Sequence, residues 1–242
     1  HYEAKLLIVG EGGTGKSSLL RALRNQKFET ILSTTHGIEV DSLVLPHPNK
    51  TNINIVLNTW DFGGQQIYHA THQFFLTKRS IYIVTWNARL GVKQGRLDYW
   101  LETIQALAPD APVLLVATHI DERAPDINYA AFKEQYPQLV GHLSISNASG
   151  AGIAELRTTL TQIAIQLPIM GKPWPATWSR LEEHLLKRPE HHIPLEAYLQ
   201  SCEDCGVEED VAKGTLGSYL HDLGKILYFQ DDFVLSDLVV LK

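Results

Sequence analysis

A glycine-rich segment near the N-terminus reads Gly10-Glu11-Gly12-Gly13-Thr14-Gly15-Lys16-Ser17. It matches the pattern G-x-x-x-x-G-K-[ST], follows an apolar run at Leu6–Val9 and opens a helical pattern. Its glycines allow backbone conformations that a Cβ would forbid, so the N–H groups can point at phosphate oxygens beside the positive end of a helix. This context favours a phosphate-binding loop (P-loop) over a chance glycine-rich turn.

Two side chains of the loop fit phosphate and magnesium chemistry. Lys16 supplies a positive charge for the β- and γ-phosphates of a nucleotide, and the Ser17 hydroxyl can ligate Mg²⁺. The residues expected to contact the nucleotide here are Gly10, Glu11, Gly12, Gly13, Thr14, Gly15, Lys16, Ser17 and Ser18.

Short apolar runs alternate with amphipathic stretches through the first two-thirds of the chain. The predicted strands are Leu6–Val9, Ile38–Leu45, Ile53–Trp60, Ile81–Trp86, Val113–Ala117 and His142–Ile145. The predicted helices are Lys16–Arg24, Gln66–Leu76, Asp98–Leu107, Tyr129–Tyr136 and Ile153–Leu167. This alternation indicates an α/β fold with helices on both faces of a six-stranded, mostly parallel sheet. A turn-rich loop joins Ile38–Leu45 to Ile53–Trp60, which predicts an antiparallel pair at one edge.

The pattern breaks at a linker, residues 168–176, which is rich in proline and glycine. Beyond it the sequence predicts helices at Thr177–Lys187, Leu195–Cys205 and Val211–Leu223. A hairpin of Ile226–Phe229 and Phe233–Leu235 is predicted to follow. Three helices and a hairpin indicate a small winged-helix-like α+β module. Leu238–Leu241 is apolar and no stop signal follows, and the chain begins with His1 instead of Met, so we expect a fragment cut from a longer protein.

Composition limits the class of protein. The apolar fraction of 44% and the charged fraction of 20% are typical of a soluble globular protein, and no stretch is long enough to span a bilayer. Two cysteines are too few for a disulfide framework, which fits a reducing cytoplasm. Residues 1–170 carry 14 basic and 14 acidic side chains, whereas residues 171–242 carry 7 and 13. This acidic excess disfavours nucleic-acid binding, the alternative that a winged helix suggests.

Two segments that follow the P-loop resemble the switches of Ras-like GTPases. Thr35 resembles the first-switch threonine that ligates Mg²⁺ and contacts the γ-phosphate. Asp61-Phe62-Gly63-Gly64-Gln65 resembles the D-x-x-G-Q second switch, in which the aspartate holds Mg²⁺ through water, the last glycine senses the γ-phosphate and the glutamine orients the attacking water. The resemblance implies catalytic roles for Lys16, Thr35 and Gln65, and Mg²⁺ held by Ser17, Thr35 and Asp61.

Three further segments resemble the guanine-binding parts of these GTPases. Thr118-His119-Ile120-Asp121 stands where most carry N-K-x-D, Ser146-Asn147-Ala148 resembles the S-A-K loop whose backbone N–H groups face guanine O6, and Phe28 stands where an aromatic ring packs on the nucleotide. The Asp121 carboxylate can accept from guanine N1–H and N2–H₂, partners that adenine lacks, and such sites discriminate by roughly 10⁴–10⁵. Thr118 is shorter than asparagine and His119 covers less than lysine. We therefore expect fast exchange and a Kd of about 1 µM.

The T-H-x-D variant is similar to that of Roc domains in Roco proteins, which include the leucine-rich-repeat kinases, and the second switch at residues 65–77 resembles theirs as well. In these proteins a COR domain follows, and residues 220–229 look like its winged-helix first half. The resemblance implies a Roc domain at residues 1–167 and part of COR at 177–242. It also implies a GTP-hydrolysing switch with Mg²⁺ that signals through COR in a larger parent chain. The half of COR that dimerises is missing, so a homodimer is expected to be weak or absent in this fragment.

The catalytic set contains no arginine in the P-loop or in either switch motif. Arg79 and Arg89 flank a predicted strand and could contribute only from a neighbouring molecule or after a large loop movement. We therefore expect slow hydrolysis, on the order of 10⁻⁴–10⁻² s⁻¹. A module that binds nucleotide without hydrolysing it is the alternative, and Gln65 argues against it.

Some other residues have structural explanations. Cys202 and Cys205 could begin a zinc site, but no second ligand pair lies at the usual spacing, so a structural pair on a helix is favoured. His191 and His192 lie between prolines and are expected in an exposed turn. The aromatic residues Trp86, Tyr99 and Trp100 are expected in the core.

Overall fold

The computed structural model describes residues 1–242 except 31–36, 64–74, 169, 231, 233 and 242. The chain forms two compact units. The first is Tyr2–Met170, and the second is Gly171–Lys242 together with His1. Their boundary falls inside the linker predicted at residues 168–176. No helix in the described part of the chain is long and apolar enough to cross a membrane.

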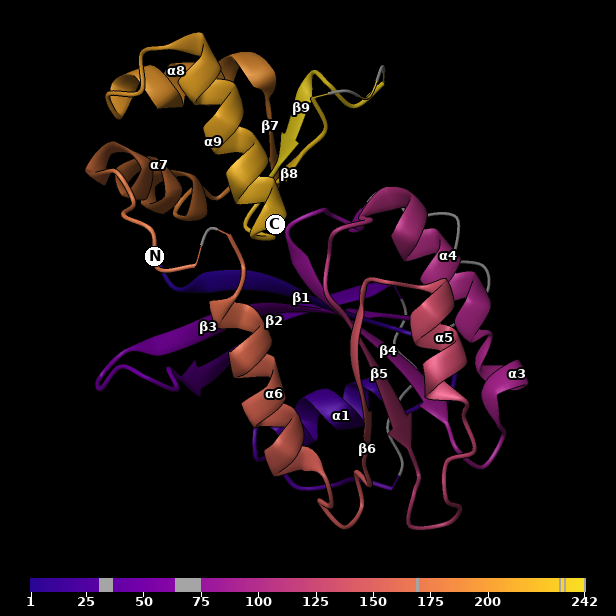
Figure 1. The fold of residues 1–242 in the computed structure, drawn as a ribbon. Helices are drawn as coiled ribbons and strands as arrows, with labels where there is room; N and C mark the ends of the chain where they lie inside the picture. The colour runs from indigo at the N-terminus through magenta and orange to yellow at the C-terminus, as the bar shows by residue number, and fades with distance from the viewer. Residues whose placement is uncertain (31–36, 64–74, 169, 231, 233, 242) are drawn as a thin grey trace. The chain divides into compact units, whose positions relative to one another are not determined.

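The first unit is built on a six-stranded sheet in the order β2-β3-β1-β4-β5-β6 (Figure 1). The strands are β1 Glu3–Val9, β2 Ile38–Pro46, β3 Asn54–Phe62, β4 Ser80–Asn87, β5 Val113–Thr118 and β6 Leu139–Ser144. All neighbours pair parallel except β2 and β3, which form the antiparallel edge that the sequence predicted. The expectation of a six-stranded, mostly parallel α/β fold is confirmed.

Helices cover both faces of this sheet. They are α1 Lys16–Leu23, α3 Val92–Gly95, α4 Leu97–Leu107, α5 Tyr129–Gln135 and α6 Ile153–Ile165, of which the short α3 was not predicted. Leu6 and Ile8 of β1 lie in one apolar cluster with residues of α1 and α6. The alternate residues Leu7 and Val9 are equally buried, which requires cover on the other face. The predicted helix at Gln66–Leu76 falls largely outside the described residues.

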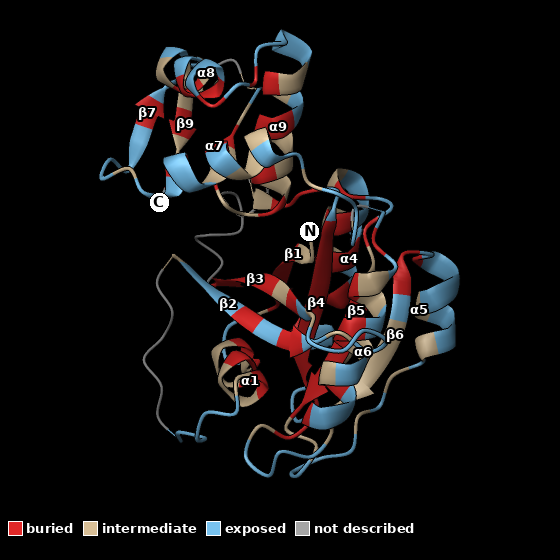
Figure 2. Cartoon of the chain, turned by 90° about the vertical axis from the view of Figure 1, so that its left-hand side faces the viewer, coloured by how far each residue is buried: buried red, intermediate tan, exposed pale blue. Residues whose placement is uncertain are grey.

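Burial follows the position of each strand in the sheet. Figure 2 shows the central strands buried throughout, whereas β2 is exposed along much of its length. A central strand of a parallel sheet is covered on both faces, so it reads as a continuous apolar run. Trp86 and Trp100 are fully buried as expected, but Tyr99 is only half-buried.

The described residues of the second unit form three helices and a three-stranded sheet. The helices are α7 Ala176–Leu186, α8 Leu195–Asp204 and α9 Asp210–Asp222. The sheet has the order β7-β9-β8, with β7 His192–Pro194, β8 Leu227–Tyr228 and β9 Leu238–Val240, all antiparallel. The three helices lie close to their predicted positions.

The hairpin prediction was wrong in its second strand. The partner of β8 is β9, which falls in the apolar run Leu238–Leu241, whereas Val234 and Leu235 of the predicted strand lie in a turn and Phe233 lies outside the described residues. The Asp232 carboxylate accepts from the N–H groups of Val234 and Leu235, both at 2.9 Å, and this turn prevents an extended conformation there. His192 was expected in a turn but begins the third strand, β7.

The core of the second unit includes both cysteine thiols. Cys202 lies in α8 and Cys205 is the C-cap of that helix. Both are buried in one apolar cluster, and burial raises the pKa of each thiol. The thiols therefore act here as small apolar side chains.

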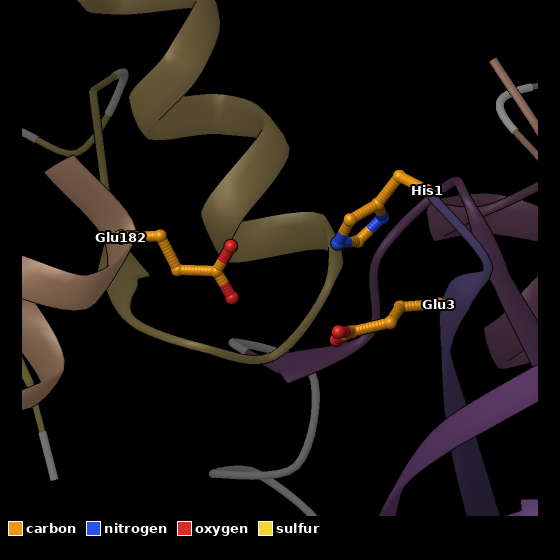
Figure 3. Close-up of side chains that lie close together, drawn as sticks. All are labelled: His1, Glu3 and Glu182. Atoms are coloured by element: carbon orange, nitrogen blue, oxygen red, sulfur yellow. The ribbon is translucent and has the colours of Figure 1, made fainter. Parts of the chain in front are cut away.

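Polar contacts also anchor the ends of the second unit. The Glu182 carboxylate on α7 lies 3.3 Å from the Lys225 ammonium. The His1 ring stacks on Trp174 with ring centroids 4.4 Å apart. Figure 3 draws His1 and Glu182 together with Glu3, a group whose side-chain types could ligate a metal. Glu3 belongs to the first unit and the other two residues to the second, so we assign no metal site to them.

Candidate functional site

The P-loop connects β1 to α1, and its glycines are required by its conformation. Gly10, Gly13 and Gly15 have φ values of 143°, 74° and 84°, which L-residues with a Cβ rarely adopt. At Gly10 the space is also closed, because a Cβ would lie 2.4 Å from the Thr85 carbonyl oxygen. Gly15 is the N-cap of α1, so the loop ends at the positive end of that helix.

Lys16 places a buried ammonium group at this loop. Its Nζ donates to the carbonyl oxygens of Gly10 at 2.9 Å and Glu11 at 3.0 Å, and the side chain is only 6% exposed. Desolvation lowers the pKa of Lys16 to about 8, although Asp61 and Glu11 act in the opposite direction. A phosphate anion at this loop would stabilise the charged form that burial disfavours.

Ser17 and Asp61 form an oxygen pair beside the lysine. Asp61 lies at the end of β3, in register with Ile8 of the neighbouring strand β1. The Ser17 hydroxyl donates to Asp61 Oδ2 at 2.5 Å, whereas Asp61 Oδ1 is buried with no hydrogen-bond partner among the described residues. Burial raises the pKa of Asp61, an effect that the Ser17 hydroxyl and Lys16 partly offset. A hydroxyl and a buried carboxylate with an unsatisfied oxygen are ligands that suit Mg²⁺.

Polar side chains behind the loop hold it in place, and the sequence analysis missed them. Thr85 of β4 donates to the Val9 carbonyl at 3.2 Å and shares a 2.8 Å hydrogen bond with the Thr14 hydroxyl. Arg96, just before α4, lies 3.8 Å from the Glu11 carboxylate. A threonine inside the apolar run of β4 was the available signal for Thr85. Nothing in the local sequence indicated the Arg96 contact.

Thr118 connects the end of β5 to the P-loop. Its hydroxyl lies 2.8 Å from the Thr14 carbonyl oxygen and 3.2 Å from that of Trp86. Although it is shorter than the asparagine of most such GTPases, the Thr118 side chain reaches the P-loop. The neighbouring His119 has a φ of 59° and its Nδ1 lies 2.9 Å from the Thr118 hydroxyl. Desolvation, followed by the charge of Arg89, lowers the pKa of His119.

Asp121 and the loop after β6 lie on the same side of the site. The Ser146 hydroxyl lowers the pKa of Asp121 by hydrogen bonding, so this exposed carboxylate is held ionised. Ser146 itself is fully buried, and its hydroxyl also accepts from the Ser149 N–H at 3.1 Å. Asn147 Nδ2 donates to the Gly15 carbonyl at 3.1 Å, while Ala148 is exposed. The structure therefore brings the predicted guanine-binding residues together with the P-loop.

Phe28 lies in the segment after α1 and is 46% exposed. Arg21 of α1 holds the chain on both sides of this ring. Its guanidinium donates to the Lys27 carbonyl at 3.2 Å and pairs with the Glu29 carboxylate. Arg21 is thus a third residue that sequence analysis missed, because its effect on Phe28 depends on the fold of the segment.

Three predicted residues, Thr35, Gly64 and Gln65, lie outside the described residues. The described part of the site consists of the P-loop, Asp61, Phe28 and the two loops after β5 and β6. One end of the site carries the Lys16 ammonium, which suits phosphate, and the other end carries the Asp121 carboxylate, a hydrogen-bond acceptor. Thr118 and Asn147 connect the two ends through their hydrogen bonds to the P-loop.

Comparison with known proteins places this site in a family. A solved structure of Methanosarcina barkeri Roco2 RocCORdC, described as bound to GDP, matches the whole chain with a TM-score of 0.91 and 34% identity. The match covers 73% of that protein's chain. The chain belongs to the Roco family. The family model "Ras of Complex, Roc, domain of DAPkinase" matches residues 5–121, and "C-terminal of Roc, COR-A domain" matches residues 175–242.

Two relatives with much longer chains match this chain over only a small part of their own length. The chain is 33% identical to the probable serine/threonine-protein kinase pats1 of Dictyostelium discoideum over 272 aligned positions, which span 99% of this chain and 8% of that protein. It is 28% identical to cyclic GMP-binding protein C of the same organism, spanning 94% of this chain and 10% of the relative. The chain thus spans a tenth or less of the length of these two relatives. Its first unit is a Roc GTPase domain, and COR-A follows it.

Proposed function

We propose that this chain binds GDP and GTP with Mg²⁺ at the P-loop of its Roc domain, hydrolyses GTP slowly and passes the change of nucleotide state to COR-A. One observation carries the proposal. Two predicted guanine-binding side chains, Thr118 and Asn147, donate to consecutive P-loop carbonyls, those of Thr14 at 2.8 Å and Gly15 at 3.1 Å. A molecule with a guanine base at one end and phosphates at the other matches the two ends of this site.

At the phosphate end, the P-loop N–H groups and Lys16 bind the β- and γ-phosphates. Ser17, Thr35 and Asp61 would hold Mg²⁺, which would supply positive charge for the phosphates when bound. The unsatisfied Asp61 Oδ1 supports this assignment. The GDP in the Roco2 structure supports a guanine nucleotide as the ligand.

At the base end, Asp121 accepts from N1–H and N2–H₂ of guanine, and the backbone N–H groups of the Ser146-Asn147-Ala148 loop face O6. The Ser146 hydroxyl supports the first role because its hydrogen bond lowers the pKa of Asp121 and so favours the ionised acceptor. Phe28, held by Arg21, covers one face of the base. Thr35 and Gly64 sense the γ-phosphate, and Gln65 orients the attacking water.

The whole protein is proposed to be a cytoplasmic, multidomain Roco protein with GTP and GDP as its ligands. The remaining part of COR and other domains of the parent chain are its proposed partners, and a homodimer is proposed only for the full-length protein. The net charge of −6 argues against nucleic acid as a partner.

Two measurements test the proposal. Calorimetric titration should give a Kd for GDP several orders of magnitude below that for ADP. Single-turnover hydrolysis of radiolabelled GTP then separates a switch from a module that only binds. Comparable affinities for GDP and ADP would contradict the guanine assignment, and tight GTP binding without phosphate release over hours would favour the binding module.

A further inference from the structure

Asn147 makes a contact that its predicted role does not require. A backbone N–H at this position can face guanine O6 whatever the side chain is. Yet the Asn147 carboxamide reaches across to the P-loop, where Nδ2 donates to the Gly15 carbonyl at 3.1 Å. The packing is close, because a Cβ at Gly15 would lie 3.0 Å from that Nδ2 atom. The side chain therefore joins the loop after β6 to the start of α1.

The geometry of a P-loop explains why such a donor is useful. When the N–H groups of the loop face the phosphates, its carbonyl groups face the surrounding protein and need donors of their own. Lys16 donates to the Gly10 and Glu11 carbonyls, and Thr118 donates to that of Thr14. At Gly15 the carbonyl accepts from the Leu19 N–H of α1 at 2.9 Å, and Asn147 adds a second donor to the same oxygen, at 3.1 Å. The last two carbonyls of the loop are thus bound by side chains from the two base-binding loops.

We propose that the Asn147 side chain is a positioning residue that controls nucleotide release. The inference rests on the proposed function and names how the same site is regulated. A bound nucleotide would bridge the base-binding loops and the P-loop, so release requires these loops to separate. The Asn147 carboxamide couples the movement of the loop after β6 to that of the P-loop. The loop after β6 cannot move away without breaking the hydrogen bond to Gly15 or displacing α1. Loss of this bond would let the base leave while the phosphates are still held.

The contact uses the donor group of the amide and not only its shape. Asn147 Oδ1 is buried and has no hydrogen-bond partner among the described residues, whereas Nδ2 holds Gly15. Asn147→Asp keeps the size of the side chain but puts an acceptor against the Gly15 carbonyl oxygen. Aspartate should therefore be worse than alanine at this position, which is the opposite of the order that packing alone would give.

The test measures release of a fluorescent N-methylanthraniloyl GDP by stopped flow, in the presence of Mg²⁺ and excess unlabelled GDP. We expect Asn147→Ala to accelerate release about threefold to tenfold, and Asn147→Asp to accelerate it further. Ser149→Ala is the matched control from the same loop. Its hydroxyl accepts only a long, exposed hydrogen bond from Ala151 N–H, at 3.3 Å, and its release rate should stay within about twofold of the wild type.

A second readout separates positioning from damage to the loop. Inosine diphosphate lacks the N2 amino group that Asp121 would bind, so the ratio of its Kd to that of GDP reports the Ser146–Asp121 contact. This ratio should be unchanged in Asn147→Ala, because the Ser146–Asp121 contact does not involve the Asn147 side chain. A collapsed ratio would mean that the loop itself is disordered, and would overturn the inference.

The two proposals fail in different ways. If the wild-type chain does not bind GDP, the proposed function fails. If it binds GDP but Asn147→Ala releases it at the wild-type rate, or if Asn147→Asp releases it more slowly than Asn147→Ala, the role assigned to Asn147 fails and the proposed function stands.

Discussion

The hydroxyl of Thr118 lies 2.8 Å from the Thr14 carbonyl oxygen, and this contact fastens the end of β5 to the P-loop. Both groups are buried, so the hydrogen bond is shielded from water. The shorter threonine side chain therefore still connects the loop after β5 to the P-loop. The remaining reason to expect weak nucleotide binding is His119, which covers less of a base than a lysine stem does.

Thr118→Val should weaken GDP binding. Valine has the size of threonine but leaves the buried Thr14 carbonyl without its donor, which costs about 1–3 kcal/mol. We expect GDP release to become at least about fivefold faster. Thr103→Val is the control, since its hydroxyl donates to the Tyr99 carbonyl within α4 and lies far from the P-loop in sequence. Unchanged release in Thr118→Val would show that the contact does not support nucleotide binding.

Asp121→Asn should change which base is preferred. The asparagine side chain can donate to the oxygen that xanthine carries at position 2, whereas it loses the charged acceptor for guanine N1–H and N2–H₂. We expect GDP affinity to fall by at least about a hundredfold and xanthosine diphosphate affinity to rise. Glu122→Gln serves as the control, because Glu122 pairs with Arg89 at 3.0 Å and has no proposed contact with the base. Competition against a fluorescent GDP measures all of these affinities.

The sequence predicts most of this architecture because its signals are local. Glycines at fixed spacing between an apolar run and a helical pattern predict the P-loop. Asp61, at the end of a predicted strand, is predicted as the carboxylate that lies beside Ser17 of that loop. The residues missed, Thr85, Arg96 and Arg21, act through contacts between segments that are distant in sequence or through the fold of a loop. The misplaced hairpin strand has a local cause, since Asp232 forms a turn that apolar patterning does not reveal.

The pKa of Lys16 predicts proton uptake when a nucleotide binds. Desolvation lowers this pKa from 10.5 to about 8. Because the folded-state value lies below the unfolded one, the contribution of Lys16 to stability is smallest below pH 8 and grows as the pH rises toward 10.5. A bound diphosphate favours the charged amine, so GDP binding at pH 8 should take up about half a proton, and affinity should fall above that pH.

Calorimetry in two buffers with different ionisation enthalpies measures this proton uptake directly. The apparent binding enthalpy should depend on the buffer at pH 8, where the terminal phosphate of GDP is ionised and the Lys16 amine is only partly protonated. Lys16→Met should bind GDP more weakly. Its apparent binding enthalpy at pH 8 should be nearly the same in both buffers, because the amine that takes up the proton is gone. Equal apparent enthalpies in both buffers for the wild-type chain would contradict the lowered pKa.

GTP hydrolysis by this chain should stay near the intrinsic rate, on the order of 10⁻⁴–10⁻² s⁻¹. Transition-state charge in phosphoryl transfer is neutralised by the P-loop lysine, Mg²⁺ and an arginine that reaches the γ-phosphate. Lys16 and the proposed Mg²⁺ ligands Ser17 and Asp61 are present. The described arginines near the site are already engaged, since Arg89 pairs with Glu122 and Arg96 lies 3.8 Å from Glu11.

Two substitutions distinguish a side chain that orients the attacking water in GTP hydrolysis from one that neutralises transition-state charge. Gln65→Leu should slow hydrolysis by tenfold or more and leave GDP affinity nearly unchanged, because the glutamine is proposed to orient water and not the diphosphate. Arg96→Ala should change the rate by less than about tenfold, because its partner is a P-loop carboxylate. A loss of about a thousandfold in Arg96→Ala, or a wild-type turnover near 10 s⁻¹, would instead identify an arginine within this chain that completes the site.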